Sequence, residues 1–133
     1  MILDTDILSA IVSPQCPERV VRELEQAEGP IHTTAVNWGE IAYGLARHAR
    51  GDRLRRAYEA RVLPALEILG FDRECAEVYG RLRARLEKKD ERLGEADLMI
   101  AAIALHHGLT LVSGNTRHFS RVPGLTLVNW LQE

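Results

Sequence analysis

The chain opens with Met1-Ile2-Leu3-Asp4-Thr5-Asp6, a short apolar run that ends at once in two carboxylates on either side of a threonine. Ile2 and Leu3 predict a buried β-strand that begins almost at the N-terminus. Asp4 then lies at the C-terminal end of that strand, which in open α/β folds is the edge where ligands bind. A carboxylate beside a buried strand costs desolvation free energy unless a partner compensates its charge. The stretch therefore predicts a functional acid whose partner is a metal ion, a helix N-terminus or a basic side chain.

Length and composition indicate one domain over residues 1–133, with 46% hydrophobic and 27% charged residues. The formal net charge of -2 excludes the strongly basic class of nucleic-acid-binding protein. Cys16 and Cys75 show no zinc-ligand spacing, so both are expected to be reduced thiols. No apolar run approaches the roughly 20 residues that span a bilayer, and the N-terminus lacks a basic signal-peptide start. We therefore expect a cytoplasmic protein with no membrane contact.

Short apolar strands alternate with longer helical patterns along the chain. Strands are predicted over residues 1–4, 31–33, 66–71, 109–113 and 125–128. Helical patterns follow the first strand, resume from Pro17 to Gly29, run from Val36 to Gly51, and then cover residues 54–65, 73–89 after an Asp72 N-cap, and 94–107 before a Gly108 C-cap. This alternation predicts an α/β fold, a three-layer α/β/α domain with a mainly parallel central sheet.

Polar residues stand at comparable places in this pattern. Asp4 ends the first strand, Glu40 lies within an otherwise apolar helix, Asp97 opens the last long helix, and Asn115 follows the strand over 109–113. A parallel sheet can gather such positions although they are far apart in the sequence. Oxygen ligands suit Mg²⁺ and Mn²⁺, and a cation would relieve the repulsion between clustered carboxylates. Sites of this kind polarise a phosphate oxygen and activate water for hydrolysis.

Several segments in order along the chain resemble a known family. They are Ile2 to Leu8, Thr33-Thr34 followed by Glu40 in a helix, Asp97 to Ala104, Leu111 to Phe119, and Pro123-Gly124-Leu125 with Trp130. Together these segments resemble the PIN-domain ribonucleases, and among them the VapC-type toxins of bacterial toxin–antitoxin pairs. The resemblance covers essentially the whole chain and implies a PIN-like version of the α/β/α domain.

The resemblance also implies roles for individual residues. Asp4, Glu40 and Asp97 correspond to the three acids that hold Mg²⁺ or Mn²⁺, and Thr5 corresponds to a residue that orients them. Asn115 stands where many members carry a fourth acid, which is a departure, since an amide offers an oxygen but no charge. Ser113 is expected to support the site, either at a phosphate or as a turn residue.

The activity and the partners follow from the same resemblance. It implies a metal-dependent endoribonuclease that hydrolyses RNA phosphodiester bonds and is inhibited by a cognate VapB-type antitoxin. It also implies a homodimer and a complex that reaches operator DNA only through the antitoxin. The RNA target, the antitoxin, the dimer surface and the number of metal ions are not readable from the sequence.

Other polar residues allow more than one interpretation. Asp6 is expected to cap the first helix or to support the neighbouring acids. His106 and His107 precede Gly108 at a helix end, where they are expected to satisfy carbonyl groups rather than bind a metal. Arginines that could bind RNA, rather than form a solvated helix face, include Arg47, Arg50 and Arg117.

Two other functions compete with the nuclease. Asp4-Thr5-Asp6 has the DxD form of an aspartate-nucleophile phosphatase, although the downstream lysine and acidic pair of such enzymes are missing. A non-catalytic PIN-like interaction module would follow if the site had decayed at Asn115. Phosphoenzyme formation on Asp4 would identify the phosphatase, and metal-dependent cleavage of RNA would exclude the interaction module.

Overall fold

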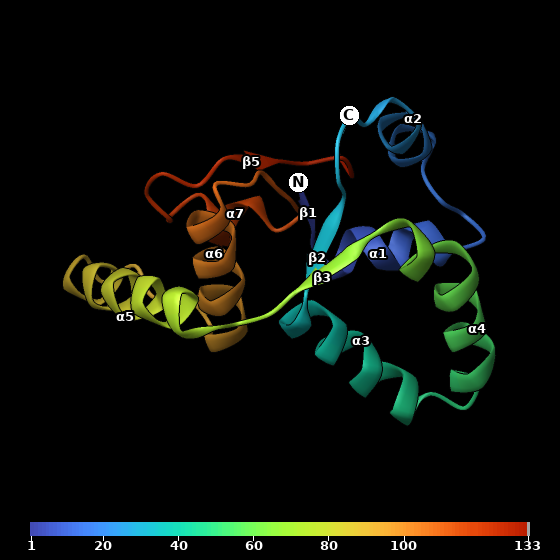
Figure 1. Ribbon diagram of the computed structural model, residues 1–133, viewed down its shortest axis with the longest axis horizontal. Helices are drawn as coiled ribbons and strands as arrows, with labels where there is room; N and C mark the ends of the chain where they lie inside the picture. The colour runs from blue at the N-terminus through green and yellow to red at the C-terminus, as the bar shows by residue number, and fades with distance from the viewer. Residues whose placement is uncertain (133) are drawn as a thin grey trace.

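The computed structural model describes residues 1–132, and a five-stranded, all-parallel sheet runs through its centre (Figure 1). The C-terminal boundary of the predicted domain, Glu133, lies outside the described residues. The strand order is β3-β2-β1-β4-β5, with β1 Ile2–Leu3, β2 His32–Thr34, β3 Glu67–Leu69, β4 Leu111–Val112 and β5 Leu127–Val128. The predicted parallel sheet is confirmed, and the N-terminal strand is its middle strand.

Helices connect the strands, as the sequence pattern predicts. They are α1 Thr5–Val12, α2 Glu18–Gln26, α3 Ala35–Arg47, α4 Gly51–Arg61, the short 3-10 helix η1 Leu63–Ala65, α5 Arg73–Lys88, α6 Glu95–His107 and α7 Thr116–Phe119. The caps predicted at Asp72 and Gly108 are present, since Asp72 accepts a hydrogen bond from the Cys75 amide and Gly108 adopts a left-handed conformation.

Some predicted boundaries are wrong. Gly51 begins α4 instead of closing α3, which ends at Arg47. Position 51 requires a glycine, because a Cβ there would lie 2.0 Å from the carbonyl oxygen of Leu45. The helix predicted over 54–65 ends at Arg61, and Pro64 lies in the 3-10 turn that follows. The helix α7 was not predicted, because its four residues are too few for a periodic pattern.

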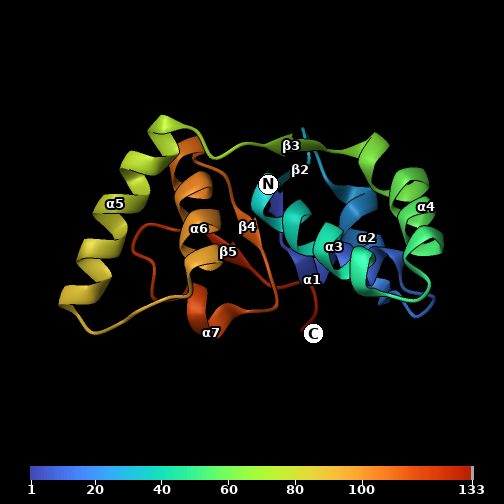
Figure 2. The ribbon, with the colours of Figure 1, turned by 90° about the horizontal axis from the view of Figure 1, so that it is seen from below.

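The two faces of the sheet are covered by different helices. Ile2 and Leu111 pack on one face with α5, α6 and α7, whereas Leu3 and Val112 pack on the other face with α1 to α4. This alternation follows from the period of two along a strand. Figure 2 shows the two groups of helices on opposite sides of the strands. The predicted three-layer α/β/α architecture is therefore confirmed.

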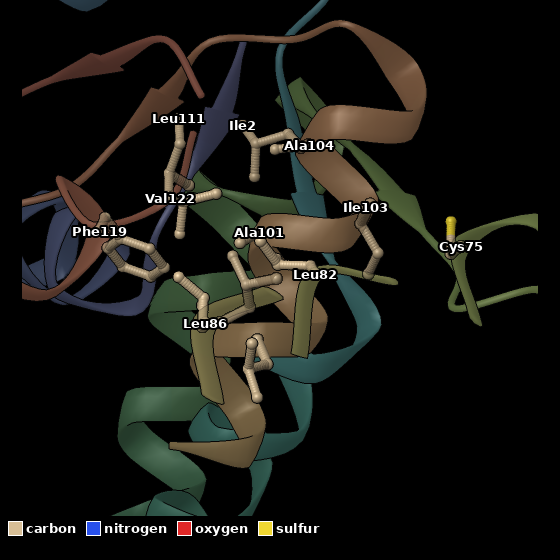
Figure 3. Close-up of a cluster of buried hydrophobic side chains, with 12 residues drawn as sticks. Ile2, Cys75, Leu82, Leu86, Ala101, Ile103, Ala104, Leu111, Phe119 and Val122 are labelled. Carbon is tan, nitrogen blue, oxygen red and sulfur yellow. The ribbon is translucent and has the colours of Figure 1, made fainter. Parts of the chain in front are cut away.

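Helix α6 is buried almost all around and forms the centre of one layer. Ala101 and Ala104 lie against Ile2 and the α5 leucines, where small side chains allow close packing (Figure 3). In residues 1–132 none of the helices is both long and apolar enough to cross a membrane.

The chain path creates a crevice beside β1. Successive strands β1, β2 and β3 lie in one direction from the centre, and the chain then returns to place β4 and β5 on the other side. In open α/β sheets ligands bind at the carboxyl ends of the strands where the strand order reverses in this way. The residues that follow β1 and β4, Asp4 and Ser113, lie at this place.

Candidate active site

Asp4 is the centre of a hydrogen-bonded cluster at the end of β1. Its Oδ1 accepts hydrogen bonds from the Thr5 amide at 2.9 Å and from Asn37 Nδ2 at 2.7 Å, and its Oδ2 accepts one from the Ser113 hydroxyl at 2.6 Å. Asp4 is 7% exposed and is the N-cap of α1. A carboxylate offers about four lone-pair positions, so the protein fills three of them. The position that remains belongs to Oδ2.

Asn37 positions Asp4, and the sequence analysis missed it. The residue is fully buried in the first turn of α3, and its amide nitrogen donates both to Asp4 Oδ1 and to the Thr5 hydroxyl at 3.0 Å. Its amide oxygen accepts a hydrogen bond from the Thr34 hydroxyl at 2.7 Å, and Thr34 is the N-cap of α3. The sequence did contain one signal for Asn37. It lies three residues before Glu40, and residues three apart share one face of a helix, so Asn37 is expected on the same face as this acid.

Ser113 and Asn115 reach the cluster from the end of β4. Ser113 is fully buried, donates to Asp4 Oδ2 and accepts a hydrogen bond from the Asn115 amide at 2.9 Å. The Asn115 side chain points to Asp97, with 3.4 Å between its Nδ2 and Oδ2 of the carboxylate. Asn115 therefore offers a donor to an acid, where a fourth carboxylate would add repulsion.

Glu40 and Asp97 complete the set of acids, and both are only partly surrounded by protein. Glu40 Oε1 accepts a hydrogen bond from the Thr5 hydroxyl at 3.1 Å. Burial raises the pKa of Glu40, and the charges of Asp4 and Asp97 add to this increase against the lowering effect of Thr5. Burial and the charge of Asp4 likewise raise the pKa of Asp97. The fold thus brings together Asp4, Thr5, Glu40, Asp97, Ser113 and Asn115, as the sequence analysis expected.

Asp6 supports the loop after β4 and does not cap α1. The N-cap is Asp4, so the capping interpretation of Asp6 is wrong. Oδ2 of Asp6 accepts a hydrogen bond from the Gly114 amide at 2.8 Å, whereas its buried Oδ1 has no partner in residues 1–132. A Cβ on Gly114 would lie 2.7 Å from that same Oδ2, which explains the glycine. Burial and the charge of Asp4 raise the pKa of Asp6.

The acids fit a hard divalent cation by their chemistry. The metal ligands that Asp4, Glu40 and Asp97 offer are all carboxylate oxygens. The raised pKa values of Glu40 and Asp97 reflect burial and neighbouring negative charge, which a cation would offset. The three carboxylates do not belong to any group of residues 1–132 whose ligand atoms all lie within 4.8 Å of one another.

The arginines considered for RNA lie at the ends of different helices. Arg47 contacts Tyr43 through a hydrogen bond of 3.1 Å to the hydroxyl and through the face of the ring. A cavity of about 240 Å³ extends from Thr5 and Glu40 between α1, α3 and α4. Arg50 lines a neighbouring hollow that shares His48 and Leu54 with this cavity.

Arg117 lies on α7, on the Asp97 side of the site. Its neighbour His118 is near enough that its charge lowers the pKa of Asp97, against the larger effect of burial. The unpredicted helix α7 therefore brings His118 close to the candidate centre.

Comparisons with known proteins agree with this geometry. A family model described as the PIN domain matches residues 1–125. Ribonuclease VapC2 of Rickettsia felis is 32% identical over 130 residues, covering 96% of each chain. Toxin FitB of Neisseria gonorrhoeae is 31% identical over 125 residues, covering 90% of each. The crystal structure of VapBC2 from Rickettsia felis bound to a DNA fragment from their promoter contains a chain with a TM-score of 0.90, 30% identity and 97% coverage of both chains.

Proposed function

The chain belongs to the PIN-domain family, and from this membership we propose that it is an endoribonuclease that acts as the toxin of a toxin–antitoxin pair. The observation that carries the proposal is the anchored carboxylate at the end of β1. Three protein donors hold Asp4 in a buried position, and two further acids, Glu40 and Asp97, surround it. One buried acid with two further acids beside it at a ligand-binding edge carries a repulsion that a catalytic cation would remove.

We assign the residues of the cluster distinct tasks. Asp4, Glu40 and Asp97 would hold the cation, with the remaining lone pair of Asp4 Oδ2 as its ligand. Thr5, Asn37 and Ser113 fix the orientation of Asp4, and the Thr5 hydroxyl also ties Glu40 to it. Burial and the neighbouring acids raise the pKa of Glu40, which is the effect that a cation bound beside it would offset.

The metal is of the class that oxygen ligands select. The family is generally dependent on a divalent metal, and the all-oxygen donor set favours Mg²⁺ or Mn²⁺. When bound, such a cation polarises the scissile phosphate and stabilises the charge that develops during hydrolysis. Asn115 supplies no charge to this centre, so the protein contributes three carboxylates where many relatives contribute four.

The partners proposed for this chain follow from its function. An antitoxin protein would inhibit the nuclease and would carry the operator-DNA contact, in keeping with the promoter-bound VapBC2 complex of Rickettsia felis. We propose that Arg47, Arg50 and Arg117 guide the RNA substrate, because arginine binds phosphate well. In support, Arg50 lines a hollow that adjoins the cavity beside Glu40, and Arg117 lies on α7 next to His118. We also propose that the toxin is a homodimer.

Cleavage of total cellular RNA by the purified protein tests the function. We expect discrete products with Mn²⁺ or Mg²⁺, none with EDTA, and none with the Asp97→Asn variant. Mapping the ends of the products would identify the RNA target. Asp90→Asn, a charge-matched change in the turn after α5, is expected to cut like the wild type.

Two outcomes would overturn the proposal. A metal-loaded, antitoxin-free protein that cuts no RNA would favour the non-catalytic interaction module. Equal cleavage by wild type and Asp97→Asn would remove Asp97 from the catalytic set. The phosphatase alternative has lost its support, because the matched relatives are ribonucleases and toxins.

A further inference from the structure

A second set of metal-ligating side chains lies where α5 begins and α6 ends. The Cys75 sulfur and ring nitrogens of His106 and His107 all lie within 4.8 Å of one another. Within residues 1–132, no other group of three or more Cys, His, Asp or Glu side chains has its ligand atoms this close to one another. The sequence analysis expected His106 and His107 to satisfy carbonyl groups and found no metal spacing for Cys75. The sequence has no metal-binding motif at these residues, because Cys75 lies on α5 and the two histidines lie about thirty residues later on α6.

The two histidines converge although they are adjacent in the chain. Successive residues of an α-helix point about 100° apart, so neighbouring rings ordinarily diverge. Here the ring centroids of His106 and His107 are 4.9 Å apart and the planes meet at 73°. Both residues are exposed at the end of α6, whereas Cys75 is fully buried beneath them. The three ligand atoms thus combine one buried sulfur with ring nitrogens of two solvent-exposed histidines.

Cys75 lies at the margin of the apolar core. In Figure 3 it is set apart from the leucine, isoleucine and phenylalanine side chains of the same cluster. Its sulfur lies 4.0 Å from the carbonyl oxygen of Gly70, and the side chain also interacts with the Asp72 carboxylate. A soft or borderline cation that enters from the histidine side would replace these weak contacts of the thiol.

The charge around the sulfur also suits a cation. Asp72 caps α5 by accepting the Cys75 amide at 2.9 Å, and the two histidines are close enough to contribute to a lowered Asp72 pKa. The largest cause of that lowering is the hydrogen bond from the Cys75 backbone. One carboxylate and one thiolate would together balance the charge of a divalent ion.

We propose that Cys75, His106 and His107 bind Zn²⁺, with solvent as the fourth ligand, and that the ion clamps the start of α5 to the end of α6. A sulfur and two imidazoles form a ligand set that zinc prefers and that Mg²⁺ and Mn²⁺ do not. Binding replaces the S–H bond by an S–Zn bond and releases the thiol proton to solvent. Burial and Asp72 raise the pKa of the Cys75 thiol, so this proton is present before the metal binds.

The proposed zinc site is separate from the candidate active site. His106 follows Asp97 by nine residues on α6, which corresponds to about 14 Å along the helix axis. The active-site ligands are oxygens only, whereas the second site has sulfur and nitrogen. A probe that reports sulfur ligation therefore distinguishes the two sites.

Titration of the purified full-length chain with Co²⁺, a spectroscopic substitute for Zn²⁺, tests the proposal. We expect a thiolate-to-cobalt charge-transfer band in the near ultraviolet that saturates at one ion per chain and disappears when Zn²⁺ is added. The band should be lost in Cys75→Ser and weakened or lost in His106→Gln and His107→Gln. It should persist in Cys16→Ser, because Cys16 packs against the cluster on the opposite face of the sheet. It should also persist in Asp97→Asn.

Stability measurements distinguish the loss of a zinc ligand from a failure of the variant to fold. The exposed His106→Gln and His107→Gln variants are expected to fold like the wild type without metal, so they remain informative if Cys75→Ser is unstable. Zn²⁺ should raise the melting temperature of the wild type by several degrees and that of the histidine variants by much less. Absence of the band in the wild type would overturn the proposal. A band that keeps its full intensity and affinity in both histidine variants, or one that vanishes in Cys16→Ser, would do so as well.

Discussion

The two halves of the candidate active site are held in different ways. Asp4 is buried and accepts three hydrogen bonds from donors on three segments of the chain. Glu40 is largely exposed and Asp97 is partly buried, each accepts one hydrogen bond among the described residues, and the pKa of each is raised by partial burial and by neighbouring charge. The protein alone holds the first half in place, whereas the second half has few protein partners.

This difference separates what the fold fixes from what a ligand must complete. A buried carboxylate with three donors is a rigid anchor, because moving it would leave several polar groups unsatisfied. Carboxylates that repel each other and have few donors are stabilised when a cation arrives. On the proposed function, Asp4 is therefore a pre-positioned ligand, whereas Glu40 and Asp97 gain a further partner only when a cation binds.

The largest expected effect comes from removing one charge in each half. Asp97→Asn should reduce RNA cleavage on the order of 10²–10³-fold, because the proposed cation would lose a charged ligand. Its metal-free stability should stay the same or rise by up to about 1 kcal/mol, because repulsion at a half-exposed site is relieved. Asp4→Asn should lose as much activity and also about 1–3 kcal/mol of stability, because an amide donor would face the donors that now bind Asp4.

Cleavage assays and urea unfolding of both variants check this pair. Equal destabilisation by Asp4→Asn and Asp97→Asn would remove the distinction between the anchored and the open half. The Asp90→Asn variant serves as the charge-matched control for both measurements.

Asn37→Ala breaks the anchor without touching a metal ligand. The change removes a donor to Asp4 and leaves the Thr34 hydroxyl without its acceptor. We expect metal affinity or activity to fall about 10–100-fold, as for other groups that orient metal ligands. Titration calorimetry with Mn²⁺ measures the affinity. Asn129→Ala, at an amide outside the cluster, should bind Mn²⁺ like the wild type, and an unchanged affinity in Asn37→Ala would show that Asp4 does not need its anchor.

Asn115→Asp tests the half of the site that contains Glu40 and Asp97. A carboxylate in place of the amide that donates to Asp97 adds repulsion in the metal-free protein and a ligand charge in the metal-bound one. Metal-free stability should fall by up to about 1 kcal/mol, while the affinity for Mn²⁺ should rise about tenfold. Parallel unfolding and calorimetric titrations measure the two effects, and they should have opposite signs. A loss of both stability and affinity would contradict this interpretation of Asn115.

The smallest expected effect is the pH dependence of the metal-free protein. Because folding raises the pKa of Asp6, Glu40 and Asp97, the native state binds protons at a pH where the unfolded chain does not. Stability from these groups should therefore increase as the pH falls from neutral toward the ordinary carboxyl value of about 4. The stability advantage of Asp97→Asn over the wild type should shrink across that range. Urea unfolding at several pH values measures this difference, and a constant difference would contradict the raised pKa of Asp97.

Much of the fold was predictable from the sequence, because strands and helices alternate with clear periods. The acids were predictable as well, since Asp4, Glu40 and Asp97 each occupy a distinctive place in that alternation. Asn37 was not, because a buried amide in a helix has no pattern of its own until the opposite segment is placed against it. Asp6 was misjudged for the same reason, since its partner Gly114 lies more than a hundred residues away.

Thermal unfolding of wild type and Asp97→Asn, with and without Mn²⁺, tests the central claim most directly. That claim is that repulsion among incompletely held carboxylates is relieved by a cation. It predicts that Mn²⁺ raises the melting temperature of the wild type by several degrees and leaves Asp97→Asn nearly unchanged. Without metal, Asp97→Asn should melt at the same temperature as the wild type or higher. If Mn²⁺ stabilises both proteins equally, or if metal-free Asp97→Asn melts well below the wild type, the claim is wrong.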